Sequence, residues 1–231
     1  YGANRFDFYD LTAIIKKDWI VGFCQELLDR KLDIAWQLPA GTRAEAIDDE
    51  VASLLARSGH RNLVYAPETG SQRMLGLIEK KVQIPRMLDS MRSSIRNGIS
   101  VKLNMIVGFP EETRRDIWET YRFLVKCAWV GVDDVTIATF SPYPGSALFA
   151  DLQRDGVISD ELGDDYFYGL ITMGDVKGAI SYAKHIKGPA LLRYKLFGIF
   201  LFYSLSYLSH PLRILRTARN LYRGEHETRI E

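Results

Sequence analysis

The sequence predicts an α/β fold built on a parallel sheet, and three observations support that class. Short β-prone runs alternate regularly with stretches whose apolar residues recur at helical spacing. The clearest run, residues 103–107 (LNMIV), has the apolar character of a strand buried on both faces. It ends at Gly108 and Pro110, and helical spacing resumes soon afterwards. Such alternation implies right-handed crossovers, so the fold is either an arc of a (β/α) barrel or a doubly wound sheet.

Five strands are expected, and each of the first four is followed by a helix. The strands are predicted at residues 5–11, 33–40, 62–66, 103–107 and 134–140. Apolar stripes predict helices over residues 20–27, 47–55, 84–95 and 117–129, with a short helical turn at 75–78. If all five strands are parallel, their carboxyl ends share one edge of the sheet.

The composition fits one full-sized domain with or without an appendage. The chain has 231 residues, of which 47% are hydrophobic and 26% charged, and its net charge is +1. This near-neutral balance argues against a general nucleic-acid surface, so DNA is not an expected partner. The two cysteines, Cys24 and Cys127, fall inside apolar helical patterns and are expected to be buried thiols. No secretory signal follows Tyr1, so we expect a cytoplasmic protein, and we expect this chain to be part of a longer one.

The shared carboxyl edge is the expected ligand site, because loop side chains and backbone groups converge there in α/β folds. Each candidate also has a structural alternative: an acidic residue can cap the next helix, an arginine can pair with a nearby carboxylate, and a tyrosine can pack in a turn. No P-loop, GxGxxG or His-Glu-x-x-His motif names a chemistry. The residues expected at this edge are Asp10, Arg43, Glu68, Gly108, Glu111 and Tyr143.

Three segments together resemble the core of radical S-adenosylmethionine (SAM) enzymes. They are residues 68–80 (ETGSQRMLGLIEK), 104–113 (NMIVGFPEET) and 140–146 (FSPYPGS). The likeness is to the cobalamin-associated class, which includes methyltransferases and an anaerobic ring cyclase, and it covers about residues 6–152. The resemblance implies a partial (β/α) barrel over residues 1–155 that lacks its first strand. Residues 156–231 would form a mainly helical C-terminal extension.

The resemblance also implies a chemistry. In the family, a [4Fe–4S] cluster bound by a CxxxCxxC loop reduces SAM to methionine and a 5′-deoxyadenosyl radical. This sequence has no CxxxCxxC, and two isolated cysteines cannot hold such a cluster. We therefore expect the cluster loop and any cobalamin domain to lie outside this chain, which alone would be inactive. The alternative is a non-catalytic binding or scaffold domain that has lost its cluster.

Four residues take roles in SAM binding from the resemblance. Glu68 matches a position that contacts the ribose or the methionyl part of SAM, where a carboxylate can accept from hydroxyl or ammonium donors. Lys80 matches a basic residue that meets the SAM carboxylate, although it could equally be a solvated lysine beside Lys81. Ile106 and Gly108 match the strand that contacts adenine.

Further contacts are implied on both sides of the site. Ser141 and Tyr143 match a second segment beside adenine, and Asp10 and Arg43 would face the substrate or SAM. The expected partners are a small-molecule or lipid-like substrate and a protein reductant such as flavodoxin or ferredoxin.

The C-terminal tail raises a separate expectation of peripheral membrane contact. Residues 196–209 are uncharged and apolar but shorter than the ~20 residues needed to cross a bilayer. After Pro211, arginines occupy one arc of a predicted helix and apolar residues the opposite arc, as in an interfacial anchor. The alternative is that the apolar run packs on the barrel while the arginines are solvated. The arginines concerned are Arg213, Arg216, Arg219 and Arg223.

Overall fold

One parallel sheet organises the chain in the computed structural model, which describes residues 2–9, 14, 16–39, 47–175, 180–225 and 228. All its neighbouring strands run in the same direction, and their order in the sheet follows their order in the sequence. This sequential order is that of an arc of a (β/α) barrel, so the predicted α/β class and partial barrel are confirmed. The strands are β1 (Arg5–Asp7), β2 (Ala35–Leu38), β3 (His60–Glu68), β4 (Ser100–Val107) and β5 (Asp134–Thr139).

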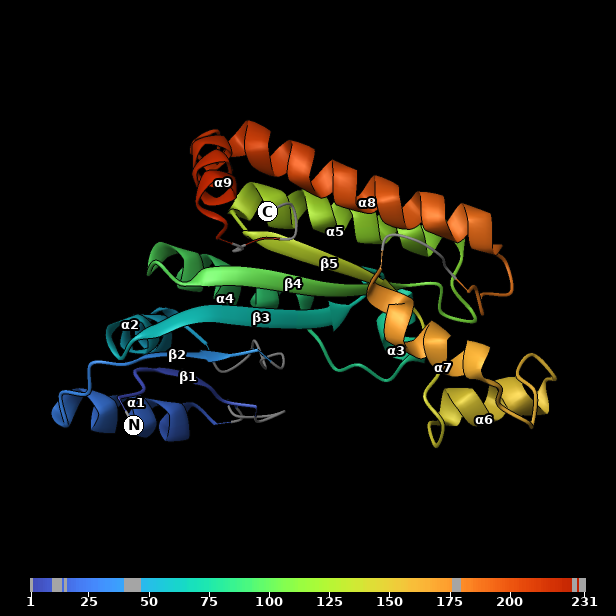
Figure 1. Ribbon diagram of the computed structural model, residues 1–231, viewed down its shortest axis with the longest axis horizontal. Helices are drawn as coiled ribbons and strands as arrows, with labels where there is room; N and C mark the ends of the chain where they lie inside the picture. The colour runs from blue at the N-terminus through green and yellow to red at the C-terminus, as the bar shows by residue number, and fades with distance from the viewer. Residues whose placement is uncertain are drawn as a thin grey trace.

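Helices connect the strands and extend the fold beyond the sheet (Figure 1). The crossovers contain α1 (Lys17–Asp29), α2 (Asp49–Arg57), α3 (Gln72–Leu77), α4 (Ile84–Arg96) and α5 (Arg114–Val130). After β5 come α6 (Ala147–Arg154), α7 (Asp164–Ile171), a 3₁₀ turn at Thr172–Gly174, α8 (Gly188–Ser209) and α9 (Leu212–Arg223). The first two strands are shorter than predicted, and β3 is longer at both ends. The sequence did not locate α6 and α7.

The helices bury one face of the sheet more completely than the other. Along β4, every second residue from Val101 to Val107 is fully buried, whereas Lys102, Asn104 and Ile106 keep partial exposure. The prediction that this strand is buried on both faces is therefore wrong. Cys24 and Cys127 are buried free thiols, as predicted.

The C-terminal helices pack on the outside of the barrel. Helix α8 lies along α5 (Figure 1), and the Tyr121 hydroxyl donates to the Tyr194 carbonyl at 2.8 Å. The apolar run thus docks on the barrel, which was the alternative to membrane contact. The expectation that the arginines of α9 are solvated is wrong for Arg213 and Arg216, which both bond to Asp133. Among the residues described, no helix combines the length and apolar character needed to cross a membrane.

Candidate functional site

The structure brings together two of the predicted SAM-binding residues. Glu68 ends β3, and the Lys80 ammonium lies 2.6 Å from its carboxylate. Ser71, and not Glu68, caps α3, and Lys80 pairs with Glu68 while keeping part of its surface in solvent; the SAM contacts of both residues stay predictions. Both side chains are partly exposed, at 22% for Glu68 and 36% for Lys80. A carboxylate and an ammonium therefore face solvent together at the carboxyl edge of the sheet.

Glu68 adopts an unusual backbone conformation that its surroundings hold in place. Its φ of 70° is in the left-handed region, which non-glycine residues seldom adopt and which is enriched at functional sites. The next two residues are fixed to α5: the Thr69 and Thr120 hydroxyls lie 3.1 Å apart, and the Gly70 amide donates to Thr120 at 3.1 Å. The loop after β3 is thus fastened to the helix that follows β4.

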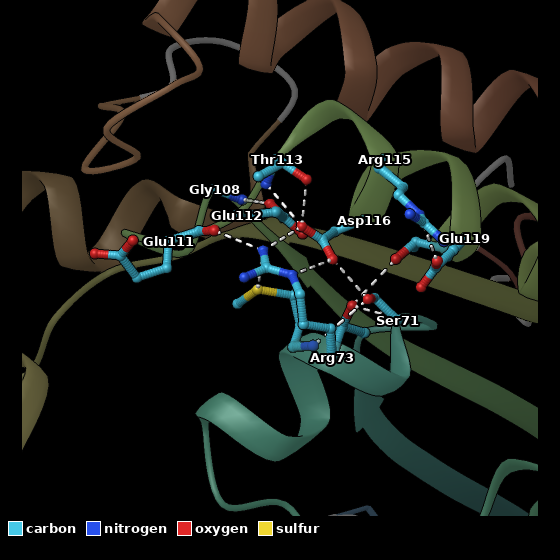
Figure 2. Close-up of polar contacts among 12 residues, drawn as sticks. Ser71, Arg73, Gly108, Glu111, Glu112, Thr113, Arg115, Asp116 and Glu119 are labelled. Carbon is cyan, nitrogen blue, oxygen red and sulfur yellow. Dashed lines mark hydrogen bonds and ion pairs between the residues drawn. The ribbon is translucent and has the colours of Figure 1, made fainter.

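A buried carboxylate, that of Asp116, also joins the loop after β3 to the start of α5 (Figure 2). Asp116 accepts hydrogen bonds from the Ser71 hydroxyl at 2.7 Å, from the Arg73 guanidinium, and from the backbone and hydroxyl of Thr113. Arg73 also donates to the Glu111 carbonyl at 2.7 Å. Burial alone would raise the pKa of Asp116, but the donors outweigh it and hold the pKa well below its usual range. The carboxylate is therefore ionised wherever the protein is folded near neutral pH.

Glu112, four residues earlier, has the opposite electrostatic character. It is fully buried; one carboxyl oxygen accepts from the Gly108 amide at 2.5 Å, and the other has no partner among the residues described. Burial raises the pKa of Glu112 to about 8, although the Gly108 amide opposes the shift. At pH 7 the carboxyl group is mostly protonated.

Gly108 is required here by backbone geometry and packing. Its φ is +91°, and an added Cβ would lie 2.7 Å from the Leu191 side chain of α8. The absent side chain therefore faces a helix of this chain. Contact between Gly108 and adenine remains a prediction.

The other predicted adenine contacts lie at the ends of β4 and β5. Ile106 pairs in register with Ala138 and packs beside a buried cluster that includes Phe109 and Phe140. Ser141 lines a cavity of about 180 Å³ with Thr139, Thr172, Met173 and Tyr182 among its walls. A larger hollow of about 420 Å³ lies along β1 and β2, apart from these residues.

The remaining predicted residues are not all gathered at one point. Tyr143 is half exposed and its hydroxyl donates to the Met173 sulfur at 3.8 Å. Glu111 pairs with Lys184 at 2.5 Å. Asp10 and Arg43 fall outside the described residues, so their predicted positions stay predictions.

Sequence reasoning missed the network around Asp116 and the burial of Glu112. A signal for the first was present, because Thr113-x-x-Asp116 has the spacing of a capping box, which the structure forms. The burial of Glu112 had no such signal.

The described residues of this chain fit one of the two implied cofactors, SAM, but not the other, the iron–sulfur cluster. Cys24 and Cys127 are far apart in sequence, burial raises the pKa of both thiols, and the described residues include no group of metal-ligating side chains. These residues do not fit a [4Fe–4S] cluster. The Glu68–Lys80 pair does fit SAM, whose amino-acid part carries an ammonium and a carboxylate.

Known proteins resemble this chain over its sheet. The sequence profile described as the radical SAM superfamily matches residues 5–124. An uncharacterized methyltransferase of Pyrococcus horikoshii, PH0819, is 26% identical over 149 residues, which are 64% of this chain and 31% of that protein. The anaerobic magnesium-protoporphyrin IX monomethyl ester cyclase of Rubrivivax gelatinosus is 26% identical over 152 residues, 66% of this chain and 27% of the cyclase. The chain thus spans less than a third of either relative.

A solved structure shares the fold. The radical SAM methyltransferase TsrM of Kitasatospora setae, determined with cobalamin and a [4Fe–4S] cluster, aligns with a TM-score of 0.55 at 12% identity. The alignment covers 67% of this chain and 31% of TsrM. At this identity the likeness concerns the fold alone.

Proposed function

Because this chain belongs to the radical SAM superfamily, we propose that it is the SAM-binding part of a longer radical SAM enzyme. The observation that carries the proposal is the Glu68–Lys80 pair at the carboxyl edge of the sheet. The pair offers one acceptor and one donor of opposite charge, both open to solvent, and so complements the two charged groups of the amino-acid part of SAM.

In this proposal the chain binds and orients SAM. Lys80 donates to the SAM carboxylate, while Glu68 accepts from its ammonium or its ribose hydroxyls, so the ion pair between the two residues is exchanged for polar contacts of each residue with the ligand. Ile106 packs against adenine from the less covered face of β4, with Ser141 and Tyr143 beyond it. Bound SAM supplies the radical chemistry of the family. The cluster must be held by residues outside this chain.

The proposed reaction is a methyl transfer or a cyclisation. The support comes from the relatives, which are named as a methyltransferase and a ring cyclase, and from TsrM, which was determined with cobalamin. The substrate would be a small or lipid-like molecule, and electrons would come from a flavodoxin or ferredoxin type of protein.

The test uses the complete protein, reconstituted anaerobically with iron and sulfide. We expect it to cleave SAM to 5′-deoxyadenosine, and we expect Glu68→Gln and Lys80→Met each to weaken SAM binding by about 1 to 3 kcal/mol, because each leaves a charged ligand group without its partner. Lys17→Met is the matched control, since Lys17 pairs with Asp48 between α1 and α2.

Two results would contradict separate parts of the proposal. If both variants bind SAM as the wild type does, the assignment of Glu68 and Lys80 is wrong. If a protein with a complete cluster does not cleave SAM, the domain is a non-catalytic binding or scaffold module.

A further inference from the structure

Two arginines of helix α9, Arg213 and Arg216, attach it to the barrel. The Arg213 guanidinium donates to the carbonyls of Gly131 and Val132, at 2.5 and 2.7 Å, and approaches Asp133 at 3.2 Å. Arg216 reaches the same carboxylate at 3.0 Å. These contacts fix which side of α9 faces the protein.

The apolar side of α9 consequently faces outward. Leu215 is 68% exposed and Tyr222 is 92% exposed, and both lie on the arc opposite Arg213. Exposed apolar residues gathered on one arc of a helix mark an interaction surface, because none of the described residues removes them from water. We call this surface the outward arc of α9; it consists of Ile214, Leu215, Ala218, Leu221 and Tyr222.

The charged residues of α9 itself are all positive, and the first acidic residue after the helix is the exposed Glu225. Residues 188–224, which include all of α8 and α9, contain no Asp or Glu. Arg219 and Arg223 are exposed at the border of the arc, whereas Arg213 is held by the barrel contacts above and by the Ser206 hydroxyl of α8 at 2.6 Å. Trp129, 74% exposed, is the next-to-last residue of α5, and its neighbour Ala128 accepts from the Ser209 hydroxyl of α8.

We propose that α9 binds the surface of an anionic lipid membrane through its outward arc. The apolar side chains would enter the boundary between headgroups and acyl chains, Tyr222 would lie at headgroup level, and Arg219 and Arg223 would contact lipid phosphates. An apolar arc bordered by Arg219 and Arg223, on a helix without acidic residues, matches such a surface in both polarity and charge. The proposal does not depend on SAM binding.

The position of α9 indicates what this contact does. The residues that hold it, Gly131 to Asp133, come directly before β5 and so lie at the amino ends of the strands (Figure 1). The predicted SAM site lies at the carboxyl ends. Binding through α9 would therefore hold the protein at the membrane and leave the site uncovered, so the contact is a tether and does not form the substrate entrance.

The test is flotation of the complete protein with vesicles, which requires no SAM and no cluster. The wild type should float with vesicles of equal parts phosphatidylglycerol and phosphatidylcholine at low salt, and much less with phosphatidylcholine alone or at high salt. Leu215→Asp combined with Tyr222→Asp should abolish flotation. The control, Leu32→Asp with Val157→Asp, adds two carboxylates at half-exposed apolar positions outside α9 and should float normally.

A second variant isolates the charge. Arg219→Gln with Arg223→Gln should weaken vesicle affinity roughly thirtyfold, because each arginine near an anionic surface contributes about 1 kcal/mol. Flotation of the outward-arc variant at the wild-type level would overturn the proposal, as would failure of the wild type to bind anionic vesicles. If the outward-arc variant instead halves the mass of an oligomer and lipid has no effect, the arc is a contact between copies and the proposal is wrong.

Discussion

The two ends of helix α5 are each held by an arginine and an aspartate, but the aspartate binds the N-terminal end and the arginine binds the carbonyls after the C-terminal end. At its N-terminus the buried partner is the carboxylate: Asp116 is 2% exposed, whereas the Arg73 side chain is 50% exposed. At its C-terminus the arginine is buried as well: Arg213 is 14% exposed and Asp133 11%. An anion therefore lies where the amides of a helix are unpaired, and a cation where its carbonyls are unpaired.

This difference has consequences for function. The N-terminal network ties the loops after β3 and β4 together, and these loops carry Glu68 and Gly108. The C-terminal network touches none of the predicted SAM-binding residues and instead sets the orientation of α9. Substitutions in the N-terminal network should disturb the carboxyl edge of the sheet. Substitutions in the C-terminal network should disturb the C-terminal helices.

The largest expected effect is at Glu112, just before the N-cap of α5, and it depends on pH. Its pKa is about 8 in the folded protein against an ordinary value of 4.5, so stability present below pH 4.5 is lost as the pH rises to about 8. Glu112→Gln should remove this loss, which amounts to at most about 5 kcal/mol. The measurement is urea unfolding of both proteins at several pH values. A difference between them that does not change with pH would show that Glu112 is not held neutral.

A smaller effect is expected at Asp116, with the opposite dependence on pH. Asp116→Asn places an amide donor among groups that already donate, so it should lower the free energy of unfolding by about 3 kcal/mol at pH 7. Because the pKa of Asp116 is depressed, this penalty should shrink as the pH falls below about 3.8, where the carboxyl group of the unfolded chain becomes neutral while that of the folded protein is still ionised.

The control for Asp116 is an exposed ion pair of the same chemistry. Asp151 pairs with Arg154 on α6, and both side chains are largely exposed. Asp151→Asn should change stability by about 0.5 kcal/mol or less. Equal losses for the two variants would mean that the network at the start of α5 is ordinary surface electrostatics.

The sequence was sufficient for the parts of this fold that depend on local pattern. Strand and helix alternation predicted the parallel sheet, and the end of β3 predicted a polar site at Glu68. Lys80, twelve residues later, comes within reach of Glu68 because α3 turns the chain back; the resemblance assigned both residues to SAM but did not predict that they pair with each other. Helices α6 and α7 are short and lacked a repeated apolar stripe, so no local pattern defined them.

The features that were missed depend on contacts between distant residues. Glu112 has the composition of a solvated helix start, and only the packing around it shows that it is buried. The amphipathic pattern of α9 was visible, but the side facing inward was not, because Asp133 and the carbonyls that bind Arg213 lie some 80 residues earlier. Periodicity finds two faces of a helix and cannot say which one the protein covers.

The smallest of the three effects is expected at the C-terminal end of α5. Arg213→Met keeps the length of the side chain but leaves the carbonyls of Gly131 and Val132 without their donor, while Arg216 still pairs with Asp133. The loss should be about 2 kcal/mol, within the usual penalty for unpaired buried groups, and limited proteolysis should become faster within α9 first. Arg219→Met, an exposed change on the same helix, should leave both measurements unaltered. If Arg213→Met leaves α9 as resistant to protease as in the wild type, this arginine does not hold the helix, and the outward direction of its apolar arc must have another cause.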